Sequence, residues 1–109
     1  MSIWDKLFNR KNAPEIPAGY VLAPKRLVEG KLPVCYMYRE APDNNQDTGW
    51  RFFSGSETDE YVNDPDNIGL YDIQTIMNND KDVIPYLSAP YGSAYERAGK
   101  SQPFSAVEN

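Results

Sequence analysis

The chain of 109 residues contains no histidine and a single cysteine, Cys35. The commonest general base and the commonest nitrogen ligand of zinc are therefore missing. One cysteine excludes an internal disulfide, and no histidine is present to activate it as a nucleophile. Because Cys35 lies in an apolar stretch, we interpret it as a small hydrophobic residue in a reducing, cytoplasmic setting.

Long hydrophobic runs and known catalytic motifs are also missing. No apolar stretch approaches the length that spans a membrane, and the first residues lack the apolar core of a signal peptide. No glycine-rich phosphate loop, nucleophile elbow or dinucleotide fingerprint occurs. Asp64 and Asp66 hint at a calcium loop, but in that register Ile68 and Thr75 occupy ligand positions and are poor ligands there. We therefore expect no catalytic residues, metal, cofactor or membrane segment.

Acidic residues are concentrated in the middle of the chain. The sequence has 16 Asp and Glu against 11 Lys and Arg, a formal net charge of −5. Residues 40–72 hold nine of these acids and one basic residue, Arg51. Five aromatic residues share that stretch, so we expect it to be folded rather than disordered. Nucleic acid is a poor partner for this charge, whereas a structured acidic surface favours a cationic one.

The hydrophobic pattern predicts one small α+β domain, an antiparallel sheet with short helices packed on it. Strands are expected at 20–23, 26–28, 34–39, 50–54, 69–71 and 94–97. The strands at 34–39 and 50–54 should pair antiparallel through a polar loop at 41–49. Short helices are expected after Ser56, after Asp72 and around Pro85, with Ser56 and Asp72 as N-caps.

The two ends of the chain are expected to lie outside this domain, which we place at residues 19–97. Residues 2–10 carry two apolar i,i+4 pairs and predict an amphipathic helix, followed by a connector up to residue 18. That helix either docks on the domain or binds a partner, including a second copy in a homodimer. Residues 98–109 show no periodicity and are expected to be a flexible tail.

A partner-binding surface is predicted over the loop 41–49 and the stretch 57–66, because arginine and aromatic residues anchor interfaces and charges set their specificity. Its predicted members are Asp43, Asp47, Trp50, Arg51, Glu57, Asp59, Glu60, Tyr61, Asp64 and Asp66. Alternatives remain open for some of them. Trp50 also fits the core, which we favour for it, and Arg51 also fits an internal ion pair. Glu57, Asp59 and Glu60 would also stabilise the first turns of a helix.

Four segments carry a resemblance to a known family. They are Tyr-Met-Tyr-Arg-Glu at 36–40, Asp-Thr-Gly-Trp-Arg-Phe-Phe-Ser-Gly at 47–55, Asp-Pro-Asp-Asn-Ile-Gly at 64–69 and Gly-Ser-Ala-Tyr-Glu-Arg at 92–97. In this order they resemble the bacterial family immunity protein 33, from about residue 19 to residue 97. The family was formerly a domain of unknown function, and the resemblance carries over no toxin-binding residue.

The resemblance implies a small cytoplasmic protein that neutralises a toxin of a related or competing bacterium, as in polymorphic toxin systems. We therefore expect a non-enzymatic protein that binds and occludes a cationic partner, a toxin domain. Two alternatives are a housekeeping or regulatory protein-binding module, and a small carboxylate-dependent hydrolase.

Overall fold

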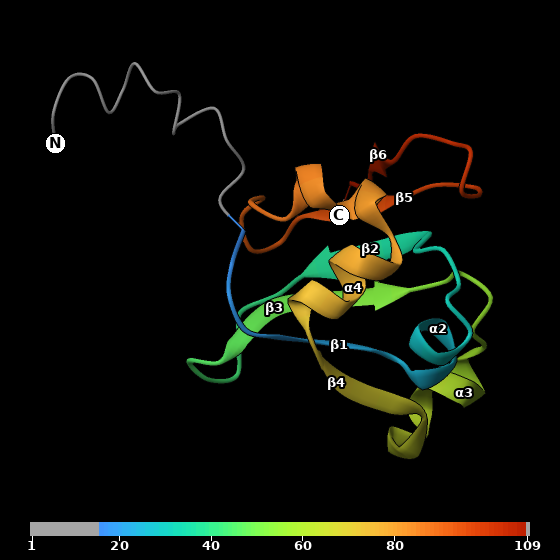
Figure 1. Cartoon of the computed structure of the whole chain (residues 1–109), viewed down its shortest axis with the longest axis horizontal. Helices are drawn as coiled ribbons and strands as arrows, with labels where there is room; N and C mark the ends of the chain where they lie inside the picture. The colour runs from blue at the N-terminus through green and yellow to red at the C-terminus, as the bar shows by residue number, and fades with distance from the viewer. Residues whose placement is uncertain (1–15, 109) are drawn as a thin grey trace, which may run out of the picture.

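The computed structural model describes residues 16–108, which Figure 1 shows with their element labels. The predicted N-terminal helix, and the homodimer proposed through it, lie outside the described residues. Six strands form one sheet in the order β4-β1-β3-β2-β5-β6. They are β1 (Tyr20–Pro24), β2 (Tyr36–Arg39), β3 (Asp47–Phe53), β4 (Ile68–Asp72), β5 (Ala94–Glu96) and β6 (Ser105–Ala106).

Neighbouring strands of the sheet are antiparallel except β1 and β3, which are parallel. The predicted antiparallel pairing of β2 with β3 is confirmed, with Tyr38 opposite Arg51. The predicted α+β class is confirmed as well. The helical segments are α2 (Lys25–Glu29), α3 (Asp59–Asn63), α4 (Ile73–Asn79) and the 3-10 turns η2 (Pro65–Asn67) and η3 (Lys81–Tyr86).

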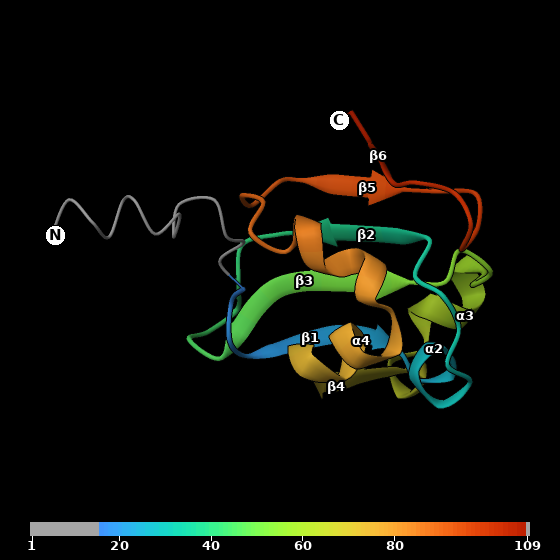
Figure 2. The ribbon, with the colours of Figure 1, turned by 45° about the horizontal axis from the view of Figure 1, so that its top comes forward.

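The hydrophobic core lies between one face of the sheet and the helices α2, α4 and η3. Figure 2 shows α4 lying across this face, while α3 lies at the end where β3 stops. The sheet and these helices contribute the buried side chains Val21, Ala23, Leu27, Met37, Trp50, Phe52, Ile76, Val83 and Leu87. Burial of each large side chain stabilises the fold by about 1.5–3 kcal/mol.

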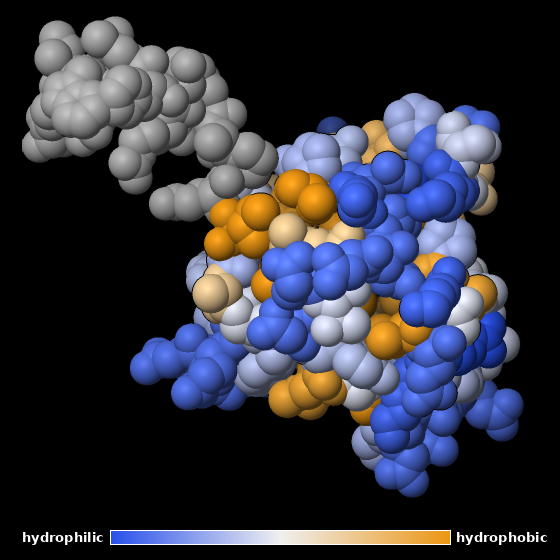
Figure 3. All heavy atoms as spheres, in the orientation of Figure 1, coloured by the Kyte–Doolittle hydropathy of each residue, from blue (hydrophilic) through white to orange (hydrophobic). Residues whose placement is uncertain are grey.

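The outer surface of the helical layer is mostly hydrophilic. Figure 3, in the orientation that has α4 in front, shows hydrophilic side chains over most of this side and only small separate hydrophobic areas. The apolar residues Ile73, Ile76 and Met77 of α4 are buried instead, which places the apolar side of this helix against the sheet. This side of the molecule therefore offers no large apolar area to a partner.

Two helical predictions are confirmed by backbone and capping geometry. Asp72 is the N-cap of α4, and its Oδ1 accepts a hydrogen bond of 2.8 Å from the Gln74 N–H. The apolar segment around Pro85 forms the 3-10 turn η3, with Val83 buried. Both elements follow from local patterns, a short polar cap and closely spaced apolar residues.

The predicted strand at 26–28 is wrong, because residues 25–29 form α2. Pro24 ends β1 and is the N-cap of this helix, with φ −59° and ψ 138°. Lys25, Arg26 and Leu27 are good helix formers, and Leu27 is fully buried. A single turn of five residues is too short to display helical periodicity, so the sequence pattern alone did not reveal it.

The cap of α3 also differs from the prediction. Thr58, not Ser56, is the N-cap, and its Oγ1 accepts a hydrogen bond of 3.1 Å from the Tyr61 N–H. Ser56 has other partners: its Oγ lies 2.6 Å from Nη2 of Arg26 and 2.7 Å from Oγ of Ser54. The helix therefore begins at Asp59, two residues later than a Ser56 cap would place it.

The structure differs from the predicted loose tail after residue 97. Within that segment Ser105–Ala106 forms β6 and pairs with β5. The Phe104 ring lies 5.4 Å from the Tyr86 ring, and the Arg97 guanidinium lies 4.3 Å from the centre of the Phe104 ring. One ring and two paired residues carry no detectable periodicity, which explains why the sequence did not predict this element.

A buried carboxylate joins three segments that are far apart in sequence. Oδ2 of Asp80 accepts hydrogen bonds from the Val34 N–H at 2.9 Å and from Nη2 of Arg97 at 2.7 Å. Nε of Arg97 also donates to the Val34 carbonyl at 2.8 Å. Asp80 and Arg97 therefore fix the approach to β2 against the end of β5 and the start of η3.

Candidate partner-binding surface

Eight of the nine acidic residues of the middle stretch fall into two groups at opposite ends of β3, and the ninth, Asp72, is the N-cap of α4. The loop that leads into β3 carries the first group, Glu40, Asp43 and Asp47. The segment after β3 carries the second group, Glu57, Asp59, Glu60, Asp64 and Asp66. Figures 1 and 2 both show the loop and α3 at opposite ends of this strand. Seven residues of strand span roughly 23 Å, so the length of β3 separates the two groups.

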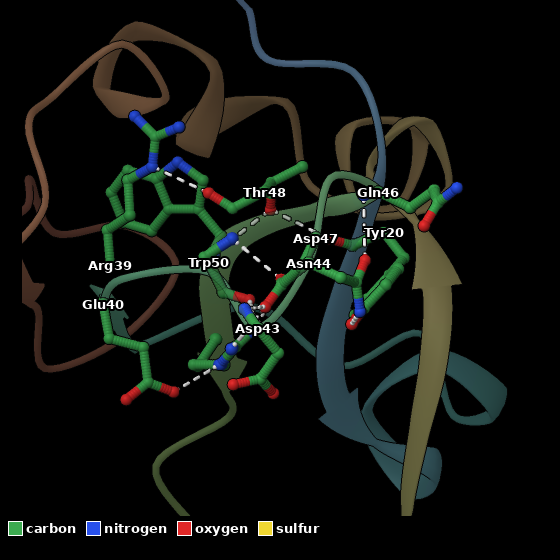
Figure 4. A network of polar contacts seen from close by, with 11 residues as sticks. Tyr20, Arg39, Glu40, Asp43, Asn44, Gln46, Asp47, Thr48 and Trp50 are labelled. Carbon is green, nitrogen blue, oxygen red and sulfur yellow. Dashed lines mark hydrogen bonds and ion pairs between the residues drawn. The ribbon is translucent and has the colours of Figure 1, made fainter.

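At the loop end, Arg51 forms ion pairs with Glu40 and Asp47, both of which are labelled in Figure 4. Its Nη1 and Nη2 each lie 2.9 Å from one carboxylate oxygen of Asp47, and its Nε lies 2.6 Å from Oε2 of Glu40. The side chains of Arg51 and Asp47 are 3% and 0% exposed. This two-bond geometry is the strongest that arginine makes with a carboxylate.

Backbone donors complete the environment of Asp47. Its two carboxylate oxygens accept hydrogen bonds of 2.9 Å from the Asp43 and Gly49 N–H groups. The hydrogen bonds from Arg51 lower the pKa of Asp47 to about 2, outweighing the upward effect of burial. Burial alone would lower the pKa of Arg51. Its hydrogen bonds and ion pairs with Asp47 and Glu40 raise this pKa by more than burial lowers it, so the net shift is upward.

Three of the predicted partner contacts are consequently internal. Asp47 and Arg51 form the buried pair, and Trp50 is fully buried. The Trp50 indole N–H donates to the Leu87 carbonyl at 3.1 Å, and its ring stacks on Phe52 with centroids 5.9 Å apart. The core assignment of Trp50 and the ion-pair alternative for Arg51 are correct. Asp43 alone of the predicted loop-end members is exposed.

The acids after β3 stay mostly in water. Asp59, Glu60, Asp64 and Asp66 are exposed, and within residues 16–108 none of them forms an ion pair. Asp59 and Glu60 lie in the first turn of α3, where the helix dipole stabilises negative charge. Oδ1 of Asp64 caps η2 by accepting a hydrogen bond of 3.0 Å from the Asp66 N–H.

Two further residues of this end are already committed to local contacts. Glu57 is half-buried, and its carboxylate accepts hydrogen bonds from the Ser54 N–H and hydroxyl and from the Gly55 N–H, at 2.6–3.1 Å. Tyr61 is half-buried beneath the Arg26 guanidinium, which lies 4.9 Å from its ring centre. We name Asp59, Glu60, Asp64 and Asp66 the α3 acidic group.

An aromatic hollow of about 410 Å³ adjoins the α3 acidic group on the face of the sheet opposite the core. Its lining comprises Tyr36, Tyr38, Phe53, Gly55, Glu57, Asp59 and Val62. The three ring centroids lie 5.8–6.1 Å apart, and the rings of Tyr38 and Phe53 are stacked at 10°. We call this site the aromatic hollow.

The aromatic hollow was missed by sequence reasoning, although a signal for it exists. Tyr36 and Tyr38 alternate along β2 with the buried Met37, so they share the face that is not the core. Phe53 joins them because it lies opposite Tyr36 on β3. From the sequence, that alternation predicts only the strand, and the structure shows that the two tyrosines are half-buried.

A second hollow of about 500 Å³ lies beside the first and shares Tyr36 and Tyr38 with it. It also contains Arg39, Glu40 and Tyr91. The Arg39 guanidinium lies 4.7 Å from the centre of the Tyr91 ring and donates to the Thr48 and Ala89 carbonyls at 2.9 and 2.8 Å. This second hollow therefore already contains a cation of the chain itself.

Among residues 16–108, no group of three or more His, Cys, Asp or Glu side chains is arranged to hold a metal ion. No helix in that range combines the length and the apolar character needed to cross a membrane.

Comparison with known proteins identifies the family of the chain. The model of the family described as the immunity protein Imm33 domain matches residues 21–108, which include every described strand from β2 to β6 and most of β1. Searches of curated proteins and of solved structures gave no match. The matched range also includes the α3 acidic group and the aromatic hollow. The chain belongs to the Imm33 family of immunity protein domains.

Proposed function

We propose that this chain is a non-enzymatic immunity protein that binds a basic toxin domain and neutralises it by occlusion. The family supports the immunity role. The observation that carries the choice of partner is the α3 acidic group, four exposed carboxylates with no ion pair inside the described part of the chain. Such a surface attracts a positively charged partner and accelerates their association.

The position of the acidic group supports recognition in preference to stability alone. A short helix needs only one or two carboxylates in its first turn, and Asp59 and Glu60 fill that role in α3. Asp66 lies beyond α3, in the first turn of the three-residue 3-10 helix η2, and its carboxylate forms no ion pair within the described residues. The nearest basic residue of this end, Arg26, is held by Ser56 and the Tyr61 ring. The surface therefore keeps its negative charge.

Co-expression tests this function directly. The chain is produced together with the toxin encoded beside it, and survival of the host and association of the purified proteins are measured. A variant with Asp59→Asn, Glu60→Gln and Asp66→Asn should associate about tenfold more slowly and protect less. Asp64 is left unchanged because it caps η2.

The matched control removes the same amount of charge elsewhere. Asp43→Asn, Glu96→Gln and Glu108→Gln alter exposed carboxylates outside the α3 acidic group and should leave association nearly unchanged. Equal slowing of association by both triple variants would show that only the net charge matters. It would contradict the proposal that the α3 acidic group is the binding surface. A wild-type chain that neither binds nor protects against the neighbouring toxin would overturn the proposed function itself.

A further inference from the structure

The aromatic hollow has the shape and chemistry of a receptor for one flat, positively charged group. Two of its rings, Tyr38 and Phe53, lie nearly parallel, and Tyr36 tilts against both at 34–42°. Aromatic faces carry negative electrostatic potential and attract cations that lie over them. The hollow thus offers a flat, electron-rich surface on the exposed side of the sheet.

Two carboxylates line the same hollow as these rings. Glu57 is held in place by three hydrogen bonds from Ser54 and Gly55, so it is oriented before any partner arrives. Asp59 is the first residue of α3, and within the described chain it has no ion pair. No lysine or arginine is among the residues that line the hollow.

The neighbouring hollow shows what such a site accepts. It shares Tyr36 and Tyr38, and there the chain supplies its own cation, the Arg39 guanidinium beside the Tyr91 ring. The cation–π contacts of the described residues all involve arginine: Arg26 on Tyr61, Arg39 on Trp50 and Tyr91, and Arg97 on Phe104. Guanidinium is flat, stacks on rings and binds carboxylates with two parallel hydrogen bonds, which ammonium does not.

We propose that the aromatic hollow receives an arginine side chain of the partner, stacked on Tyr38 and Phe53 and paired with Asp59. This inference rests on the proposed function, because it names the anchor residue that the toxin would present. The α3 acidic group accelerates the encounter, and the hollow holds the arginine afterwards. An arginine that is buried in such a pocket is a typical hot spot of a protein interface.

A small probe tests the site without knowledge of the toxin. N-acetyl-arginine amide is titrated into the full chain, and backbone amide shifts are followed by NMR. Shifts should concentrate at Gly55, Glu57 and Val62. N-acetyl-citrulline amide, which has nearly the same shape but no charge, should cause at most a fifth of the shift at equal concentration, and N-acetyl-lysine amide should bind more weakly than the arginine probe.

Two variants locate the binding groups. Asp59→Asn should weaken binding of the arginine probe by about fivefold, and Tyr38→Leu should do the same by removing a ring. Asp66→Asn is the control and should bind as the wild type does, since Asp66 does not line the hollow. Should Tyr38→Leu fail to fold, Asp59→Asn alone decides. Shifts spread over the whole surface, or equal shifts with citrulline, would overturn the inference.

The probe titration and the co-expression assay of the wild type together separate this inference from the proposed function. If the wild type protects against its toxin but the arginine probe causes no local shift, the arginine site is wrong and the immunity function stands. If the probe binds in the hollow but the wild type neither binds nor protects against the toxin, the proposed function is wrong.

Discussion

Arg51 and Arg97 are the two buried arginines of the described chain, and each is paired in the same way. Each contacts one fully buried carboxylate, Asp47 or Asp80, and one half-exposed carboxylate. A buried ion pair is a weak source of net stability, but the loss of one partner leaves a costly unpaired charge. At the residue scale, these arginines therefore position chain segments and do not provide charge for a partner.

The low pKa of Asp47 predicts a specific dependence of stability on pH. Its pKa falls from an ordinary value near 3.8 to about 2 on folding, so its stabilising effect is complete above about pH 4. That effect is lost as the pH falls toward 2, because the unfolded chain then binds the proton first. The expected loss of unfolding free energy is on the order of 1–2 kcal/mol, since water near the loop screens part of the interaction.

Chemical denaturation at a series of pH values measures this effect. Asp47→Asn lacks the titrating carboxylate, so its unfolding free energy should fall less between pH 5 and pH 2 than that of the wild type. An identical pH dependence of the unfolding free energy in the two proteins would show that the ion pair with Arg51 does not lower the pKa of Asp47.

Asp80 and Asp82 provide a matched comparison, because both contact Arg97 but only Asp80 is buried. Asp80→Ala should lower the unfolding free energy by about 3–5 kcal/mol, since it strands the Arg97 charge and the Val34 N–H. Asp82→Ala should have a much smaller effect, because the Asp82 carboxylate is half-exposed. Thermal or denaturant unfolding compares them, and similar losses would contradict a central role for Asp80.

At the scale of elements, the turn into β3 depends on a glycine. Gly49 has φ +87°, and a Cβ at this position would collide with the Glu40 carbonyl oxygen across the hairpin. Its N–H also donates to Asp47, so the backbone geometry and the buried ion pair depend on each other. Both the backbone geometry and the buried ion pair therefore hold the loop at this end in place.

Gly49→Ala should consequently lower the unfolding free energy by about 2–4 kcal/mol, through strain at positive φ and the collision together. Gly92→Ala isolates the first effect, because Gly92 has φ +97° and a Cβ there meets no atom within 4 Å. It should cost only about 1–2 kcal/mol. Equal losses in denaturant unfolding would show that the Glu40 carbonyl moves aside without cost.

Local patterns in the sequence predicted some elements and missed others for identifiable reasons. Asp72 as a cap and the alternation at 34–39 are signals carried by adjacent residues, and both elements are present. The helix α2 and the strand β6 are too short to carry a period, and their stability comes from distant contacts, such as that of Phe104 with Tyr86. Sequence alone does not specify such contacts.

The structure brings together only some of the predicted members of the binding surface, for an equally physical reason. Because they are close in sequence, Asp43 and Asp47 were predicted to share a surface with Asp59 and Asp66. The extended strand β3 lies between the two pairs and separates them in space. Asp47 and Arg51 are also buried, which no local sequence pattern indicated, so they do not belong to the surface. The aromatic hollow escaped prediction because it assembles β2, β3 and α3, which meet only in the folded chain.

For the whole molecule, the uneven charge predicts how association responds to salt. Exposed charges are screened beyond about 10 Å at 0.1 M ionic strength and beyond about 3 Å at 1 M. The association rate with a basic partner should therefore fall by about tenfold or more across this range, while the dissociation rate changes less. Stopped-flow mixing measures both rates.

The triple variant of Asp59, Glu60 and Asp66 should show a flatter dependence of the association rate on salt than the wild type. Its control, altered at Asp43, Glu96 and Glu108, should keep most of the wild-type slope. A rate that is insensitive to salt in the wild type would mean that electrostatic attraction does not guide this encounter.

The pleat of β2 separates residues that pack the core from residues that line the aromatic hollow. Met37 faces the packed interior, while Tyr36 and Tyr38 on either side of it face outward. Alternate positions of this strand therefore serve separate purposes, packing on one face and exposure on the other. If the hollow receives a partner's arginine as proposed, exchange of the two outward rings would change what it binds, while Met37 would keep the sheet packed.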